Sequence, residues 1–185
     1  MDKEWLLQET LASGALKATL IPQSSIVLSE EFRKMCESNQ CGIYGKCWMC
    51  PPAIGEINEL METVRSFPAA VLYQTVYDIE DSFDIEGMLE AKKAHARVSE
   101  KLEEKIQLQL KSRGMERFLH LTCGGCFLCK TCAIVENKPC RFPEKALSSL
   151  EAYGIDVYNT TKDTPLKYIN GQNTVTYFGM VLFEE

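Results

Sequence analysis

Two segments of the chain are apolar almost without interruption, AAVLYQTVY at 69–77 and TVTYFGMVLF at 174–183. Near-continuous apolar runs that are rich in β-branched and aromatic residues are typical of strands in buried sheet positions. Shorter apolar stretches at 16–21, 117–121 and 155–159 predict three further strands.

Apolar residues recur at helical spacing between these strands, at 3–13, 29–36, 53–67, 86–113 and 143–153. Pro68 ends the third of these helices, and Gly114 is the expected terminator of the fourth, which is the longest. The pattern predicts an α/β fold in which helices flank a mixed central sheet. A length of 185 residues is typical of one domain, so we expect a single domain over 1–185.

The composition is that of an ordinary globular protein, with 45% hydrophobic and 25% charged residues. A net charge of −6 argues against a nucleic-acid partner, because proteins that bind nucleic acid usually present a basic face to phosphate. The first twenty residues lack the features of a signal peptide, and no segment reaches transmembrane length. We therefore expect a cytoplasmic protein without a membrane partner.

Cysteine is the unusual component of the sequence. Nine cysteines in a reducing compartment do not predict a disulfide framework, and an odd number fits one poorly. Five of them lie in LTCGGCFLCKTCAIVENKPCRFP, residues 121–143, which we call the late cysteine segment. They are Cys123, Cys126, Cys129, Cys132 and Cys140.

The spacing within the late cysteine segment indicates the kind of metal centre. A Cys-x2-Cys-x2-Cys run closed by a more distant cysteine is the ligand pattern with which bacterial ferredoxins hold 4Fe-4S clusters. Structural zinc sites usually pair two separate Cys-x2-Cys turns around one ion. The run Cys126, Cys129 and Cys132 therefore favours an iron-sulfur cluster over zinc. The fourth ligand is Cys140 or Cys123, and the spacing alone leaves both open.

A second group of cysteines lies in MCESNQCGIYGKCWMCPP, residues 35–52, which we call the early cysteine segment. Its members are Cys36, Cys41, Cys47 and Cys50. Four thiols so close in sequence indicate a second ligand set, although their spacing is not the Cys-x3-Cys-x2-Cys of radical S-adenosylmethionine enzymes. With a helix predicted from residue 53, Cys50 is expected near a helix N-terminus. A thiolate is favoured there, as a metal ligand or as a redox nucleophile.

The chain has two histidines, and their positions predict different roles. His95 lies on the apolar stripe of the long helix, which favours a hydrogen-bonded core residue over a metal ligand. His120 lies on the strand that enters the late cysteine segment, so a ligand or proton-handling role stays open for it. Arg141, beside Cys140, either offsets the negative charge of nearby thiolates or lies on the surface.

The motifs CGIYGKCWMCPP and GGCFLCKTCAIVENKPCRFPEKALSSLEAYGIDV together resemble an uncharacterised family of bacterial and archaeal proteins described as predicted metal-binding, with a domain of unknown function. The resemblance spans nearly the whole chain and implies metal binding, with iron-sulfur as the expected form. It assigns no reaction. The ligands that it implies are Cys126, Cys129, Cys132 and Cys140, with Cys36, Cys41 and Cys50 from the first motif. Cys47 and Cys123 are additions to that pattern.

Three functions are consistent with these observations. The first is a redox module that holds one or two 4Fe-4S clusters and exchanges electrons with a partner protein. The second is a zinc-binding structural or adaptor protein. The third is a thiol-disulfide oxidoreductase that uses Cys47 and Cys50. No phosphate-binding glycine fingerprint or nucleophile-elbow serine is present, so the sequence leaves open whether the protein is an enzyme.

Overall fold

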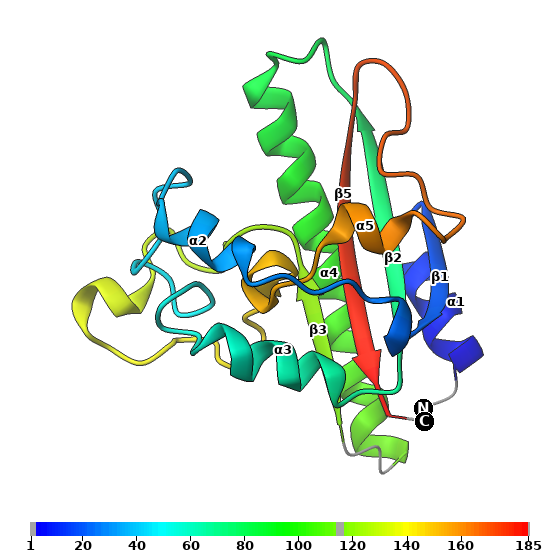
Figure 1. Ribbon diagram of the computed structural model, residues 1–185, viewed down its shortest axis with the longest axis horizontal. Helices are drawn as coiled ribbons and strands as arrows, with labels where there is room; N and C mark the ends of the chain where they lie inside the picture. Colours follow the sequence, from blue (N-terminus) through cyan, green and yellow to red (C-terminus); the bar gives the residue numbers. More distant parts are fainter. Residues whose placement is uncertain (1–2, 114–116, 185) are drawn as a thin grey trace.

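The computed structural model describes residues 3–113 and 117–184, and at its centre lies a five-stranded mixed sheet (Figure 1). The spatial order of the strands is β1-β2-β5-β3-β4. Neighbouring strands are antiparallel except for β3 and β4, which are parallel. Their bounds are β1 Lys17–Pro22, β2 Ala69–Asp78, β3 Phe118–Thr122, β4 Ser148–Ser149 and β5 Thr174–Phe183.

The two predicted apolar runs, β2 and β5, pair along their full lengths in the middle of the sheet. Successive side chains of a strand point to opposite faces, so each run supplies two cores. One core combines Leu72 and Met180 with Val64, and the other combines Val71 and Val181 with Leu102. Both faces of the sheet are therefore buried, which explains why these strands are apolar throughout.

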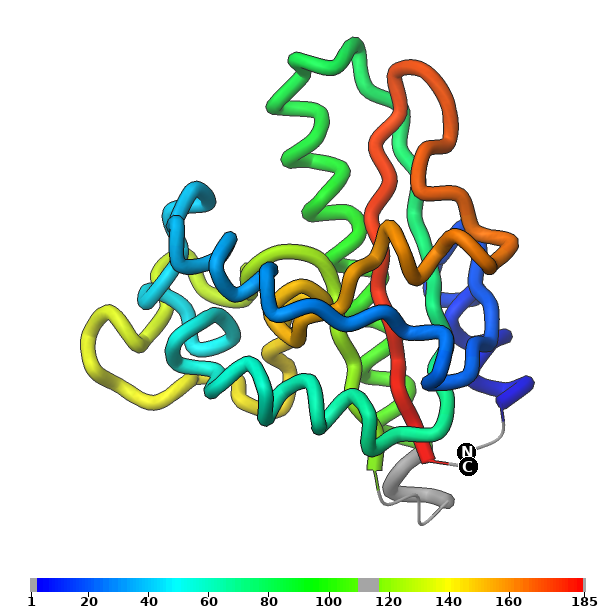
Figure 2. Tube along the Cα trace, viewed as in Figure 1, coloured from blue at the N-terminus to red at the C-terminus, as the bar shows by residue number. Residues whose placement is uncertain are grey.

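Helices cover both faces of the sheet and confirm the predicted α/β fold (Figures 1 and 2). α1 and α4 pack on one face, and α3 and α5 pack on the other, with α2 farther from the sheet. Gly114, the expected terminator of α4, lies outside the described residues. The helices are α1 Lys3–Ser13, α2 Glu31–Glu37, α3 Ile57–Arg65, α4 Ile85–Arg113 and α5 Val157–Thr161, with 3₁₀ turns η1 Gln23–Ser25, η2 Ala133–Glu136 and η3 Glu151–Tyr153.

The prediction was wrong over residues 143–159. The segment predicted as a helix at 143–153 contains the short strand β4 and the turn η3, and the segment predicted as a strand at 155–159 contains α5. Asp156 caps α5, because its carboxylate accepts a hydrogen bond from the Asn159 N–H at 2.9 Å. Leu150, Ile155 and Val157 are buried in one core, and this packing, rather than a local period, sets the conformation.

The predicted helix at 53–67 begins later than expected. Gly55 has φ +116°, which an α-helix does not accommodate, and α3 starts at Ile57. Cys50 therefore does not lie at the N-terminus of a helix, contrary to the prediction. The segment between Cys50 and α3 is a turn, in which the Ile54 N–H donates to the Cys50 carbonyl at 3.2 Å.

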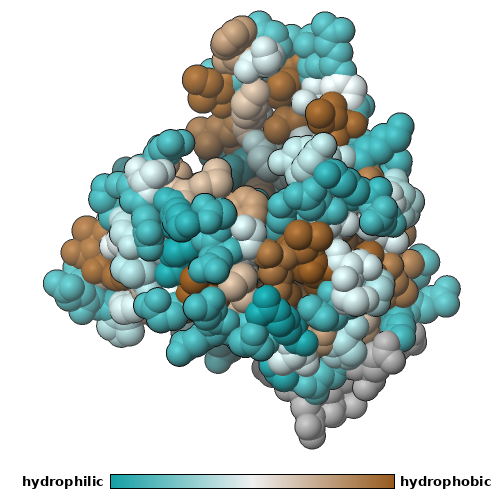
Figure 3. Space-filling model, viewed as in Figure 1, coloured by the Kyte–Doolittle hydropathy of each residue, from teal (hydrophilic) through white to brown (hydrophobic). Residues whose placement is uncertain are grey.

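The surface carries apolar side chains at the end of the molecule where α4 begins, at the upper end of the view in Figure 3. Phe83 and Ile85 are 87% and 78% exposed there. None of the described helices combines the length and the apolar composition that crossing a lipid bilayer requires.

Candidate metal centre

The two cysteine segments, residues 35–52 and 121–143, meet at the side of the sheet where β3 ends and β4 lies (Figures 1 and 2). One hydrogen bond joins the two segments directly, and a second joins the early segment to β4. The Trp48 indole N–H donates to the Lys138 carbonyl at 3.0 Å, and the Ser148 hydroxyl donates to the Met49 carbonyl at 3.1 Å. The backbone fold therefore brings the thiols of both segments into one region.

Small residues allow the close approach of the two segments. A Cβ atom at Gly125 would lie 3.0 Å from Ile43 Cδ1 and 3.5 Å from Cys50 Sγ, so the late segment passes directly against the early one. On the other side, the buried Arg33 donates from Nη2 to the Gly55 carbonyl at 2.8 Å and ties α2 to the turn before α3. These contacts fix the position of the early segment from both ends.

A first pocket, the late pocket, collects five thiols. The side chain of Trp48 and the backbone of η2 form part of its wall. Four of the thiols come from the late segment and one from the early segment. They are Cys126, Cys129, Cys132 and Cys140, with Cys47.

A second pocket, the early pocket, lies on the other side of Cys50 and is lined by Cys36, Cys41 and Cys50. Gly124 and Gly125 of the late segment form its opposite wall. The two pockets together contain the seven cysteines that the resemblance implies as ligands, together with Cys47, whereas Cys123 lines neither pocket.

Cys47 lies between the two pockets and is 2% exposed. Its sulfur is hydrogen-bonded to the Cys50 thiol, to the backbone N–H groups of Cys126 and Met49, and to the Cys132 thiol. These bonds, led by the one from Cys50, lower the pKa of the Cys47 thiol, while the same pairing raises the pKa of Cys50. Cys47 therefore links the two thiol groups physically, although the sequence pattern set it apart as an addition.

Backbone and side-chain donors are directed at the sulfurs of the late pocket. Hydrogen bonding from the Leu128 backbone lowers the pKa of Cys126, against the larger effect of burial, and hydrogen bonding with Cys129 raises the pKa of Arg141. Arg141 is held by a second bond from Nη1 to the Thr131 carbonyl at 2.9 Å. Hydrogen bonds of this kind stabilise the charge of metal-bound sulfur. Arg141 is exposed and also lies 3.6 Å from the Glu136 carboxylate, so both roles that the sequence left open for it are consistent with its position.

Burial raises the pKa of three further thiols. Desolvation is the largest cause for Cys36, for Cys126, whose pKa rises to about 11, and for Cys123, whose pKa rises to about 12. Such thiols are protonated at neutral pH in the metal-free chain. Because a metal binds the thiolate, binding at Cys126 releases a proton.

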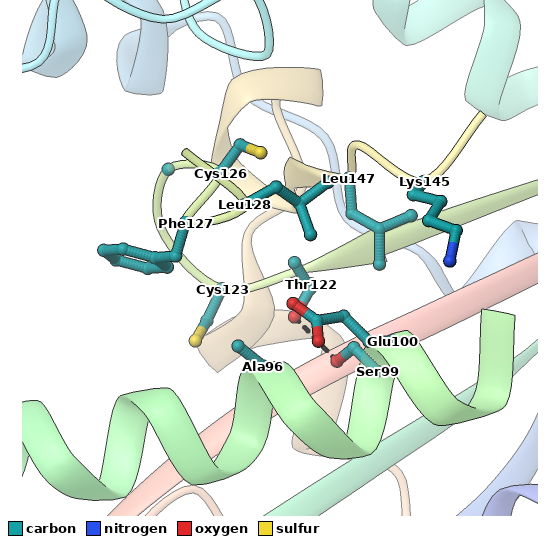
Figure 4. A pocket seen from close by; sticks show the side chains of 11 residues that line it. Ala96, Ser99, Glu100, Thr122, Cys123, Cys126, Phe127, Leu128, Lys145 and Leu147 are labelled. Carbon is teal, nitrogen blue, oxygen red and sulfur yellow. Dashed lines mark hydrogen bonds between the residues drawn. The ribbon is translucent and has the colours of Figure 1, made fainter. Parts of the chain in front are cut away.

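Cys123 lines neither thiol pocket. It lines a small cavity of about 20 Å³, room for one water molecule, on the α4 side of the late segment, and Cys126 also borders this cavity. Figure 4 shows its sulfur directed toward α4, while the sulfur of Cys126 lies on the opposite side of the loop. Of the two candidates for the fourth ligand, Cys140 shares the late pocket with Cys126, Cys129 and Cys132, and Cys123 does not.

Both histidines belong to a buried polar network rather than to the thiol pockets. His120 bonds through Nδ1 to Glu103 at 2.9 Å and through Nε2 to the Tyr73 hydroxyl at 2.8 Å. The network continues from Tyr73 through Ser99 to Thr122, in two steps of 2.8 Å each, the second of which is drawn in Figure 4. His95 bonds to a core threonine, as its place on the apolar stripe predicted.

The described thiols are not arranged as a preformed site for a single metal ion. Among the described residues, no three Cys, His, Asp or Glu side chains converge as a mononuclear ion requires. A tetrahedral zinc site needs four sulfurs about 2.3 Å from one point. The late and early pockets enclose about 20 and 100 Å³, so a centre larger than a single ion would require their loops to move apart.

Comparison with known families gives one match. The profile of the family described as "Predicted metal-binding protein (DUF2284)" matches residues 19–183, which include both cysteine segments and all five strands except the first residues of β1. No curated protein and no solved structure was found to match the chain. The match covers far more than half of the sequence, and the chain belongs to this family of predicted metal-binding proteins.

Proposed function

We propose that this protein binds 4Fe-4S clusters and passes single electrons to or from a partner protein. The observation that carries the proposal is the late pocket, where a Cys-x2-Cys-x2-Cys loop and the more distant Cys140 share one wall. Backbone N–H groups and Arg141 directed at the sulfurs supply the hydrogen bonds that thiolate-bound clusters use. When bound, such a cluster accepts and returns one electron at a time.

The ligands of the first cluster are Cys126, Cys129, Cys132 and Cys140. A second cluster takes Cys36, Cys41 and Cys50 from the early pocket, with Cys47 as its fourth ligand. The support for this assignment is that Cys47 already contacts Cys50, and that its other sulfur contact, Cys132, belongs to the first set. Cys47 therefore stands where the two ligand sets touch.

Zinc is the alternative cofactor, and nine cysteines supply enough ligands for two zinc ions. The Cys-x2-Cys-x2-Cys run of the late segment favours a cluster, because structural zinc sites usually pair two separate Cys-x2-Cys turns. A thiol-disulfide oxidoreductase needs a reactive cysteine that solvent and substrate can reach. Cys47, the thiol of lowered pKa, is 2% exposed, so the observed burial argues against that function.

The partner would approach the part of the molecule formed by the two cysteine segments, since electrons transfer efficiently only over short distances. Exposed apolar side chains surround the pockets there. Phe127 is 44% exposed, Phe142 45% and Val135 55%. Apolar side chains in such a rim are typical of surfaces that bind other proteins.

The test is a pair of cysteine variants purified without oxygen. Cys132→Ser removes a proposed ligand, and Cys123→Ser is the matched control, since it changes a thiol outside both pockets. We expect Cys132→Ser to lose about half of the iron and the electron paramagnetic resonance signal of the late cluster after reduction, while Cys123→Ser keeps the wild-type content. Equal iron in both variants, or wild-type protein that holds zinc alone, would contradict the proposal.

A further inference from the structure

A polar cavity of about 360 Å³ lies between α4, the start of the late cysteine segment and β5, outside both thiol pockets. Its size falls in the range of pockets that bind small molecules, about 300–1,000 Å³. Ten residues line it, and they come from four separate parts of the chain: Lys92, Cys123, Gly124, Leu150, Glu151, Val157, Tyr168, Thr176, Tyr177 and Phe178.

Lys92 is the only cation in this described lining. Among the described residues, no carboxylate lies within ion-pair distance of its ammonium group. The ammonium lies 5.0 Å from the centre of the Phe127 ring and against the backbone of Gly124, where any Cβ atom would collide with it. The glycine thus leaves room for the ammonium at the cavity wall, where it is half-buried and has no anion beside it.

Glu151 is the only acid in the same lining. Its carboxylate accepts a hydrogen bond from the Ser149 hydroxyl, and burial raises its pKa above the usual value. Glu151 and Lys92 influence each other electrostatically, yet they do not form an ion pair. A cation and an acid therefore line one cavity, and each is available to a separate polar group of a ligand.

One part of the lining is aromatic and aliphatic. The rings of Tyr168 and Phe178 are stacked, with centroids 5.7 Å apart and an angle of 12° between their planes. Tyr177 uses its hydroxyl elsewhere, as a donor to the Met88 carbonyl at 2.7 Å, so it presents its ring rather than a hydrogen-bond donor. Leu150 and Val157 complete a wall suited to a hydrocarbon or aromatic side chain.

We propose that this cavity binds a small amino or hydroxy acid, with the carboxylate of the ligand on Lys92 and its amine or hydroxyl on Glu151. The side chain of the ligand packs against the aromatic wall. A few polar groups that converge in one pocket are the usual arrangement by which small-molecule sites fix the orientation of a ligand. The lining does not include any proposed metal ligand, so binding does not depend on which metal the thiol pockets hold.

The cavity is nevertheless next to the early pocket. Lys92 and Gly124 line both, and the following residue, Gly125, is in contact distance of Cys50. A small molecule bound at Lys92 therefore lies beside the early pocket, whose cysteines are the proposed ligands of the second cluster.

Binding is measured by ligand-observed NMR on the anaerobically purified protein, with iron and sulfide determined on the same sample. The probes are L-alanine, L-phenylalanine, L-lactate and L-phenyllactate, together with their amides. We expect acids to bind, phenyl-bearing acids to bind more tightly than the small ones, and amides to bind at least tenfold more weakly because they lack the charge that Lys92 pairs with. This comparison needs no variant.

Variants then assign the contacts. Lys92→Met is expected to weaken the binding of the acids at least tenfold. The matched control is Lys93→Met, at the next position of α4, where the lysine pairs with Glu90, and it is expected to leave the binding of the acids unchanged. Glu151→Gln distinguishes amino acids from hydroxy acids, because loss of the carboxylate weakens the binding of an ammonium group more than the binding of a hydroxyl. The proposal is overturned if none of the four acids binds, if amides bind as well as acids, or if Lys92→Met and Lys93→Met behave alike. Iron content in the same samples tests the cluster proposal separately.

Discussion

Buried His95 makes the stability of the protein depend on pH in a defined direction. The ring is fully buried, and its Nδ1 bonds to Thr75 Oγ1 at 2.8 Å. Burial, aided by the nearby His120, lowers the pKa of His95 to about 3. In the unfolded chain the pKa is about 6.5.

The sign and size of the effect follow from these two pKa values. Between pH 7.5 and 5.0 the unfolded chain takes up a proton at His95 and the folded protein does not, so acid favours unfolding. At 1.36 kcal/mol per pH unit, and with half-protonation of the unfolded chain at pH 6.5, the loss over this interval is about 2 kcal/mol. The contribution is fully present above pH 6.5 and declines as the pH falls toward 3.

The assay is urea unfolding of wild-type protein and of His95→Leu at both pH values. Leucine has about the volume of histidine and cannot titrate. The variant therefore keeps every other pH-dependent contribution to stability and serves as the control. We expect wild-type stability to fall by about 2 kcal/mol more than that of the variant between pH 7.5 and 5.0. If both proteins lose the same free energy, His95 is not held neutral by burial and the reasoning is refuted.

Three further substitutions test the packing and the site. Gly179→Ala places a methyl group against the ring of Tyr73, its cross-strand partner, and is expected to cost about 1–3 kcal/mol in urea unfolding; an unchanged midpoint would contradict this. Trp48→Phe removes the hydrogen bond to the Lys138 carbonyl, costs about 1 kcal/mol and speeds cluster loss to a chelator, whereas an unaltered rate would show that this bond does not hold the two segments together. Cys123→Ser keeps the wild-type melting temperature of the metal-loaded protein within a few degrees, and a large drop would place Cys123 among the ligands.

The sequence predicts those parts of the fold in which one local pattern decides the structure. β2 and β5 are apolar throughout because both their faces are buried, and α4 keeps a regular stripe that includes His95. Over 143–159 the elements are only two to five residues long, and tertiary packing around Ile155 decides them. The one local signal available there was Asp156, a good N-cap three residues before Asn159.

The ligand candidates were readable from spacing, but their grouping in space was not. Spacing cannot show that Cys47 lies between two pockets or that Cys123 faces α4, because both depend on how two distant segments pack. The cavity beside Lys92 is assembled from four separate parts of the chain, and no local motif marks it. The prediction that the whole chain is one domain stays a prediction.

The central claim is that the paired cysteine segments hold iron-sulfur clusters. The most direct measurement is the amount of iron, acid-labile sulfide and zinc per chain in protein purified and reconstituted without oxygen. If the chain holds two clusters, we expect about eight irons per chain, an equal amount of sulfide, and broad absorption at about 400 nm. Protein that takes up zinc and retains no labile sulfide under the same conditions would contradict the account.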